Sequence, residues 1–330
     1  PTRRSSDLIS LKNMRPSDAR KIVGIDAASS EFDTPPEVFA PVFNDLREKG
    51  VIRQVTYHAG EDFYHVLSGL RAIYEAMLYM HMVHGDRIGH ATAAGIDIET
   101  WLSIVGEKIL IPKGEYMDDL VFAYYLINSG HVEPLLHLLP FIDKHIQALC
   151  YEIYGASYPV SFLIDCWKMR EYNPKHWNKT IADRKKLEFL EKYNGKAFRK
   201  KYGEPYELTV TDDFSASQLV ILQQEVLRFM HKNEIVIEAL PTSNLRIGYH
   251  RTLKSYQLFN WFKWKREGIP VPPIVLGTDD AGIFATNIYN EYALIYCYLV
   301  YEEKMNRSDV MNFLREINDN SKVYAFREDE

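Results

Sequence analysis

The sequence is poor in cysteine, has no long apolar run and carries no excess of positive charge. Its three cysteines, Cys150, Cys166 and Cys297, are too few and too widely spaced for a disulfide framework or a CxxC metal site, so we expect a reducing compartment such as the cytoplasm. No apolar run approaches the roughly 18 residues that span a bilayer. With 39 basic and 45 acidic residues, the formal charge of -6 argues against generic nucleic-acid binding.

Apolar residues are nevertheless abundant. Of the 330 residues, 46% are hydrophobic and 13% aromatic, which is enough for a large core and excludes a mainly disordered chain. Residues 1–8 (PTRRSSDL) have no initiating Met and resemble a translated sequencing adapter. We therefore leave residues 1–8 out of the fold prediction and expect that the chain has lost its natural start.

Short apolar segments alternate with amphipathic ones in two parts of the chain. The spacing predicts strands at 21–26, 51–57, 87–90, 234–239 and 273–278, and helices at 35–49, 64–84, 97–105, 253–267 and 288–303. Thr34 is the predicted N-cap of the first helix, with Glu37 completing a capping box. This alternation is typical of α/β proteins in which helical crossovers connect the strands of a parallel sheet.

A long segment separates the two alternating parts. Residues 107–232 show a mainly helical pattern, which divides the remainder into a first part at 9–106 and a last part at 233–330. Basic residues outnumber acidic ones between 168 and 201, where they could meet an anion or the acidic face of a partner. The alternative interpretation is a solvated helical face.

Polar motifs follow four of the predicted strands. They are HAGE at 58–61, RIGHA at 87–91, PTSN at 241–244 and GTDDAG at 277–282. In parallel α/β folds, and above all in (β/α)₈ barrels, active sites are built from residues at the carboxyl ends of the strands. We therefore expect these motifs to meet in one pocket.

The residue types in these motifs suit metal-assisted hydrolysis. His58 could bind a metal and Glu61 could hold a proton above the same pocket, although a plain loop histidine and a surface glutamate fit equally well. Of the adjacent Asp279 and Asp280, one carboxylate could bind the metal while the other hydrogen-bonds a ligand. Alternatively, the pair could cap the next helix. His90 could orient a water molecule, or could be an ordinary core histidine.

Taken together and in this order, the four motifs resemble those of the adenosine deaminase family of the amidohydrolase superfamily. Residues 21–31 (KIVGIDAASSE) are similar to the family strand that precedes a substrate-binding glycine, and residues 306–326 are similar to its terminal helices. The resemblance implies a zinc-dependent (β/α)₈ barrel of the TIM type. In this chain the barrel would be incomplete and interrupted by the helical insertion.

The resemblance also implies roles for individual residues. His58 and Asp279 would be zinc ligands, and Glu61 would protonate the purine ring nitrogen. His90 would orient the attacking water and Asp280 would hydrogen-bond the base. The reaction implied is the hydrolytic deamination of adenosine or a related adenine compound to an inosine-type product and ammonia.

Three departures from the family pattern qualify this hypothesis. The His-x-His pair that supplies two zinc ligands has no counterpart, since no two histidines of the sequence are separated by a single residue. We therefore expect this chain alone to bind zinc weakly and to be inactive. Ser29 stands where the family has its substrate-binding glycine, and the insertion resembles that of enlarged deaminases that assemble into shells in bacterial anti-phage defence.

Two other hypotheses remain open. The substrate could be AMP, ATP, adenine or a modified base instead of adenosine. Alternatively, the barrel could have lost catalysis and serve as a scaffold in an assembly. Both deaminase hypotheses predict a purine nucleoside or nucleotide as the partner. The deaminase and scaffold hypotheses all allow a homo-oligomer formed through the insertion.

Overall fold

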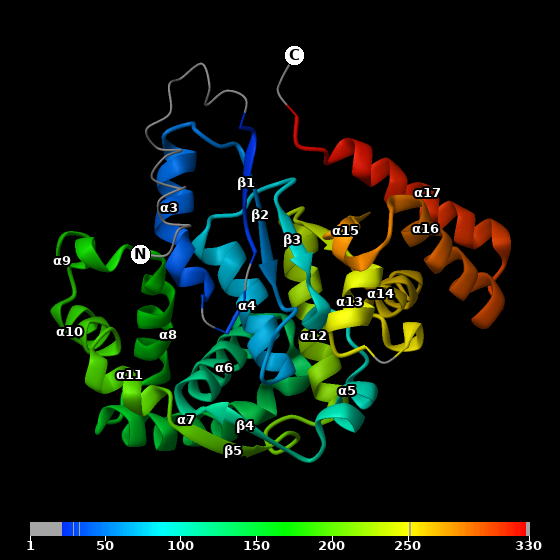
Figure 1. Ribbon diagram of the computed structural model, residues 1–330. Coiled ribbons are helices and arrows are strands. Elements are labelled where there is room, and N and C mark those ends of the chain that lie inside the picture. The colour runs from blue at the N-terminus through cyan, green and yellow to red at the C-terminus, as the bar shows by residue number, and fades with distance from the viewer. Residues whose placement is uncertain (1–21, 29, 33, 251, 328–330) are drawn as a thin grey trace.

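The structure is a computed structural model that describes residues 22–28, 30–32, 34–250 and 252–327 (Figure 1). Residues 1–8, which we expected to be an artefact, lie outside the described residues, as does Ser29. Within the described residues, no helix is both long and apolar enough to cross a membrane.

A five-stranded parallel sheet forms the centre of the molecule. Its strands are β1 (Gly24–Ala27), β2 (Gln54–Ala59), β3 (Arg87–His90), β6 (Val236–Ala239) and β7 (Ile274–Leu276). They lie in the order β1-β2-β3-β6-β7, which is also their order along the chain, with β4 and β5 left out. All four neighbouring pairs are parallel. The α/β fold with a parallel sheet is therefore confirmed.

The sequential strand order determines where the connecting helices lie. Right-handed crossovers between successive neighbours all turn in the same direction, which places the helices on one face of the sheet. The crossovers contain α3 (Pro36–Glu48), α4 (Val66–Tyr79), α12 (Ala216–Lys232) and α14 (Gln257–Arg266), and α4 packs against both α3 and α12. Among the described strands β1 and β7 form the two edges, so the sheet is open.

The two faces of the sheet differ in polarity. Tyr57, Ile88 and Ile237 occupy neighbouring positions of β2, β3 and β6, and all three belong to the hydrophobic core. On the opposite face Arg87 donates from Nη1 to Glu238 Oε1 at 2.6 Å, which joins β3 to β6. The apolar face thus packs on helices, whereas charged side chains line the other.

Two local predictions from the sequence are wrong. Thr34 does not cap α3, because its hydroxyl donates to the Ser30 carbonyl at 2.9 Å and Pro35 occupies the N-cap position. The helix predicted at 64–84 is also too long, since α4 ends at Tyr79. Its N-terminus is instead well defined, because the ring of His65 accepts from the backbone N–H of Leu67 and a capping box with Ser68 is present.

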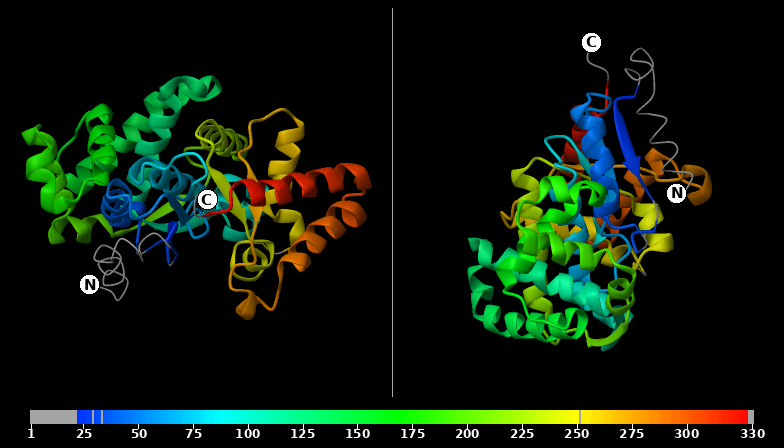
Figure 2. Two further views of the ribbon diagram at one scale, coloured as in Figure 1. Left: turned by 90° about the horizontal axis from the view of Figure 1, so that it is seen from above. Right: turned by 90° about the vertical axis from the view of Figure 1, so that its left-hand side faces the viewer.

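The long segment between β3 and β6 begins with α5 (Ile98–Val105) and ends with α12. Between them β4 (Lys108–Pro112) and β5 (Pro205–Thr209) pair as an antiparallel ribbon. The ribbon brings together the two ends of the helical segment that lies between these strands. The helices between the two strands are α6 (Lys113–Leu126), α7 (Leu139–Tyr154), α8 (Val160–Lys168), α9 (Trp177–Thr180), α10 (Arg184–Tyr193) and α11 (Lys196–Tyr202). Figure 2 shows α8–α11 at one end of the molecule and α16 (Ile288–Cys297) with α17 (Arg307–Val323) at the other.

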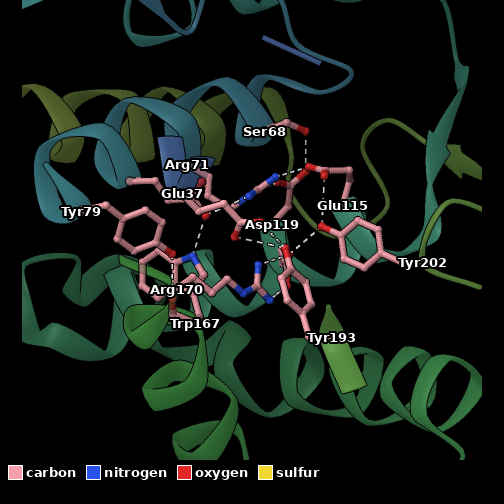
Figure 3. Close-up of polar contacts among 12 residues, drawn as sticks. Glu37, Ser68, Arg71, Tyr79, Glu115, Asp119, Trp167, Arg170, Tyr193 and Tyr202 are labelled. Carbon is pink, nitrogen blue, oxygen red and sulfur yellow. Dashed lines mark hydrogen bonds and ion pairs between the residues drawn. The ribbon is translucent and has the colours of Figure 1, made fainter. Parts of the chain in front are cut away.

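Two buried arginines bind carboxylates where the insertion meets the central fold, and one of them, Arg71, joins the two parts (Figure 3). Arg71 of α4 donates from Nε to Asp119 of α6 at 2.8 Å and from Nη1 to Glu75 at 2.9 Å, and it also pairs with Glu115. Arg170, after α8, binds Asp118 of α6 through both terminal nitrogens at 2.6 and 2.9 Å. We call the two arginines and their carboxylate partners the arginine cluster; its members are Arg71, Glu75, Glu115, Asp118, Asp119 and Arg170.

Candidate active site

The polar motifs meet at the carboxyl ends of the strands, as the sequence predicted. His58 lies in β2 and His90 is the last residue of β3. Asn244 lies in α13 (Pro241–Ile247), which follows β6, and Asp279 follows β7. We call these four residues and Glu61, in the turn after β2, the active-site cluster. The strand carrying His58 is shifted relative to the predicted 51–57, since it begins at Gln54 and reaches Ala59.

The turn after β2 fixes the position of Glu61. Gly60 has a φ of +77°, and a Cβ there would lie 2.7 Å from Ile73 Cδ1, so only glycine fits. The carboxylate of Glu31, from the connection between β1 and α3, accepts from the backbone N–H groups of Gly60, Glu61 and Asp62 at 2.7, 2.8 and 3.3 Å. Three hydrogen bonds to consecutive residues hold this turn in one conformation.

Glu61, His90 and Asn244 form the centre of the cluster. Glu61 Oε1 lies 3.0 Å from His90 Nδ1. The side-chain amide of Asn244 lies 2.8 Å from His90 Nδ1 and donates to Glu61 Oε1 at 3.2 Å. The ring of His58 lies beside that of His90, with a centroid separation of 4.9 Å. His90 and Asn244 are buried, so water does not compete for these contacts.

The surroundings keep Glu61 protonated at neutral pH. Burial raises the pKa of Glu61 to about 8, and the nearby charges of Glu31 and Asp62 act in the same direction. Burial lowers the pKa of His90 to about 3, with a further contribution from His58. The contact between Glu61 and His90 is therefore one between two uncharged groups, and the cluster holds an available proton on a carboxyl group.

His58 has a carboxylate partner on the neighbouring strand. Burial lowers the pKa of His58, but Asp26 of β1, with Oδ1 3.4 Å from His58 Nδ1, outweighs it, so that the pKa is raised overall. Within the described residues, His58 Nδ1 is buried without a hydrogen-bond partner of acceptable geometry. His58 and Asp279 line one cavity of about 520 Å³ on the charged face of the sheet, together with Asp26, Arg87 and Glu238.

The two adjacent aspartates differ in their contacts. Asp279 has a φ of +54°, and its carboxylate accepts from the hydroxyl of Ser243 at 2.6 Å and from the backbone N–H of Asp280 at 2.9 Å. Asp280 is exposed and occupies the N-cap position of the short helix α15 (Ala281–Phe284) without capping it through its side chain. Both residues are exposed, but two hydrogen bonds hold the carboxylate of Asp279, which lines the cavity.

The described residues do not by themselves form a complete zinc site. His58 and Asp279 provide an imidazole and a carboxylate, both suitable zinc ligands, but a catalytic zinc site uses three protein ligands. Across residues 22–327, apart from the undescribed positions, no group of three or more His, Cys, Asp or Glu side chains is placed to hold a metal ion.

The sequence prediction missed two residues of the site. Glu31 was part of the strand motif used for the family resemblance, and Asn244 was part of the PTSN motif, but neither was given a role. Glu31 bonds to residues 29 and 30 positions further along the chain, and Asn244 bonds to residues 183 and 154 positions before it. Contacts over such separations cannot be predicted from a local sequence pattern. Ser29, the predicted substrate-binding residue, lies outside the described residues.

Comparison with known proteins does not add to this description. No protein-family model matches the chain, and no curated protein matches its sequence. The arguments that follow therefore depend on the residues and their geometry.

Proposed function

We propose that the chain belongs to a zinc-dependent hydrolase that deaminates adenosine or a related adenine compound. The observation that carries this proposal is the active-site cluster: a protonated, half-buried Glu61 lies beside a neutral His90, and His58, next to His90, lines one cavity together with Asp279. In this proposal the sheet is part of a (β/α)₈ barrel, and polypeptide outside this sequence supplies the remaining zinc ligands. Zinc, when bound, supplies the acidity that makes water a nucleophile near neutral pH.

The residues of the chain would act on the two ends of the reacting group. Hydrolytic deamination adds the oxygen of water to the amino-bearing ring carbon and breaks the carbon–nitrogen bond, so that ammonia leaves. Glu61 would give its proton to the adjacent ring nitrogen, because its pKa of about 8 keeps that proton in place at neutral pH. His90 would orient the incoming water, and the exposed Asp280 would hydrogen-bond the purine.

The charges around the cavity favour an uncharged substrate over a nucleotide. Asp26, Glu238 and Asp279 line the cavity, and its one arginine, Arg87, is paired with Glu238 at 2.6 Å. A phosphate group would meet this acidic lining without a free cation to bind it. We therefore favour adenosine or adenine over AMP and ATP. Because its three cysteines are free thiols, we place the protein in the cytoplasm.

Two measurements test the proposal on the complete protein. Ammonia release and the ultraviolet change of the purine should show turnover of adenosine after zinc loading, with adenosine preferred to AMP and ATP at equal concentration. Metal analysis should find about one zinc per chain. The chain described here, assayed alone, should show little of either. Absence of both turnover and zinc in the complete protein would contradict the proposal and favour the scaffold hypothesis.

A further inference from the structure

A buried glutamine lies behind the active-site cluster. Gln257, the first residue of α14, is fully buried. Its amide nitrogen Nε2 lies 3.2 Å from the backbone carbonyl oxygen of His90, 3.3 Å from Thr92 Oγ1 and 3.1 Å from Asn244 Oδ1. The side chain therefore touches both the backbone of His90 and the side chain that contacts the His90 ring.

These contacts determine which group donates in the hydrogen bonds that link Gln257, Asn244 and His90. A backbone carbonyl can only accept, so the atom of Gln257 that faces the His90 carbonyl is the NH₂ group. That NH₂ group then donates to the oxygen of Asn244, which leaves the Asn244 NH₂ group facing His90 Nδ1 at 2.8 Å. An NH₂ group can only donate, so His90 Nδ1 is its acceptor and carries no proton. Glu61 Oε1, 3.0 Å from the same nitrogen, accepts from this NH₂ group as well, at 3.2 Å.

We infer that Gln257 is a positioning residue that acts through Asn244 to hold neutral His90 in the tautomer with its proton on Nε2. The consequence is that Nε2 donates a hydrogen bond to whatever reaches it and does not accept a proton. If the proposed function is right, His90 orients the attacking water as a hydrogen-bond donor, and proton donation to the substrate is left to Glu61. The tautomer itself does not depend on the proposed function.

Burial gives this arrangement its strength. Gln257 and Asn244 are both fully buried and His90 is 1% exposed, so bulk water is not at hand to replace a lost partner. A buried donor or acceptor without a partner costs about 1–3 kcal/mol. Turning the Asn244 amide over would place its NH₂ group against that of Gln257 and its oxygen against unprotonated Nδ1. In the opposite tautomer Nδ1 carries the proton, so the protein loses the Asn244–His90 bond if the amide stays in place, or the Gln257–Asn244 bond if the amide turns, unless Gln257 is removed.

Nitrogen-15 NMR of the histidine rings measures this tautomer directly. Protein labelled in its 11 histidines is recorded at pH 8, where an ordinary histidine is neutral, and His90 is assigned from the signal lost in His90→Gln. We expect the Nδ1 shift of an unprotonated nitrogen and the Nε2 shift of a protonated one. The reverse pattern in the wild-type protein would overturn the inference.

Two variants separate the roles of the two amides. Gln257→Met keeps an unbranched side chain of similar size but removes the donor, so that the Asn244 amide can turn, and the two His90 nitrogens should shift toward each other. Asn244→Asp replaces the donor with an acceptor while Gln257 still donates to it, and should put a proton on Nδ1. An unchanged His90 spectrum in either folded variant contradicts the inference.

Gln223 offers a matched control. It is also a fully buried glutamine, and its Nε2 donates to the backbone carbonyls of Ala93 and Ile96, both at 2.9 Å, without contact to Asn244. Gln223→Met should lower the thermal midpoint about as much as Gln257→Met and leave the His90 tautomer unchanged. A shift of the His90 tautomer in this control would show general loosening of the core and would also overturn the inference.

The readout separates this inference from the proposed function. If the tautomer responds as expected but the complete, zinc-loaded protein turns over no adenine compound, only the proposed function fails. If turnover is found but the tautomer does not respond, only the role of Gln257 fails. Where both hold, Gln257→Met should lower kcat more than it changes KM, because the altered group contacts the reacting water and not the bound substrate.

Discussion

Glu61 of the active-site cluster and Asp118 of the arginine cluster are carboxyl groups with little exposure, 14% and 2%, yet they hold their protons differently. In the arginine cluster, burial raises the pKa of Asp118, but two bonds from Arg170 outweigh burial and the pKa is lowered overall. In the active-site cluster Glu61 is bonded to uncharged groups, and burial raises its pKa to about 8. The bonds from Arg170 thus separate Asp118 from Glu61, which stores a proton, whereas Asp119, buried beside Arg71, still has a pKa raised to about 7.

The largest expected effect is on activity. Glu61→Gln removes the stored proton but keeps the shape of the side chain, so we expect adenosine turnover by the complete protein to fall about 10²–10⁴-fold, the usual contribution of a general acid. The melting temperature at neutral pH should stay close to that of the wild-type protein, because the protonated carboxyl group and the amide are both uncharged.

Asp62→Asn is the control for this change. Asp62 is the neighbouring residue, and its side chain is exposed. Turnover in this variant should stay close to that of the wild-type protein. Equal losses in Glu61→Gln and Asp62→Asn would show that Glu61 has no special role as a proton donor.

The second effect is on stability and concerns the arginine cluster. The side chain of Arg170 is 5% exposed and that of Asp118 is 2% exposed. Arg170→Met leaves the Asp118 charge buried without its cation, which should cost about 3–5 kcal/mol of unfolding free energy. Urea unfolding followed by circular dichroism measures this loss.

Two further variants sharpen the result for Arg170. Combining Arg170→Met with Asp118→Asn should recover most of the lost stability, because the uncompensated charge is removed as well. Arg184→Met, at an ion pair whose arginine is 89% exposed, should change the unfolding free energy by less than about 1 kcal/mol. A loss in Arg170→Met no larger than in Arg184→Met would contradict a stabilising role for the cluster.

The third prediction uses the opposite pKa shifts of Glu61 and Asp118. Because the pKa of Glu61 is raised from 4.5 to about 8, its contribution to stability is complete below pH 4.5 and is lost as pH rises through about 8. The folded state binds the extra proton in this window, so stability should fall by up to about 1.4 kcal/mol per pH unit. Burial likewise raises the pKa of Glu31, to about 7, which adds to the slope.

Asp118 should show the reverse dependence. Its pKa is lowered, so its contribution is present above pH 3.8 and is lost as pH falls below that value. Unfolding free energies at pH 5, 6, 7 and 8 for the wild-type protein and Glu61→Gln test the first part, since the variant should show a smaller decline. Parallel curves for the two proteins would mean that Glu61 titrates as an ordinary carboxyl group.

The sequence predicted elements and motifs better than contacts. The strand at Arg87–His90 and the helix beginning after Asp97 were predicted closely, because short apolar runs and N-cap residues are local signals. The end of α4 and the cap of α3 were wrong, since tertiary contacts decide where a helix stops. For the site, the sequence predicted the strand ends that carry His58, His90 and Asp279.

Long-range hydrogen bonds were outside the reach of sequence patterns. Gln257 joins residues 13 and 167 positions away, and nothing in its neighbourhood marks it as different from other helix residues. Arg71 and Asp119 pair across 48 positions, and no local pattern in the sequence singles out either residue. A buried charge can be recognised only when the fold shows that its side chain has left the solvent.

The smallest predicted effect separates the guanidinium from the hydroxyl in the arginine cluster. Tyr202 of α11 donates from its hydroxyl to Asp118 Oδ2 at 2.7 Å and to Glu115 Oε1 at 3.0 Å. Its ring is packed against Gly114, where a Cβ would lie 1.9 Å from Tyr202 Cδ2, so Tyr202→Phe should keep the ring in place. Because Asp118 retains both bonds to Arg170, the loss should be only about 0.5–1.5 kcal/mol by urea unfolding. A loss as large as in Arg170→Met would assign the stability of the cluster to the hydroxyl and would remove the contrast with Glu61, since a cation would no longer be what distinguishes Asp118 from Glu61.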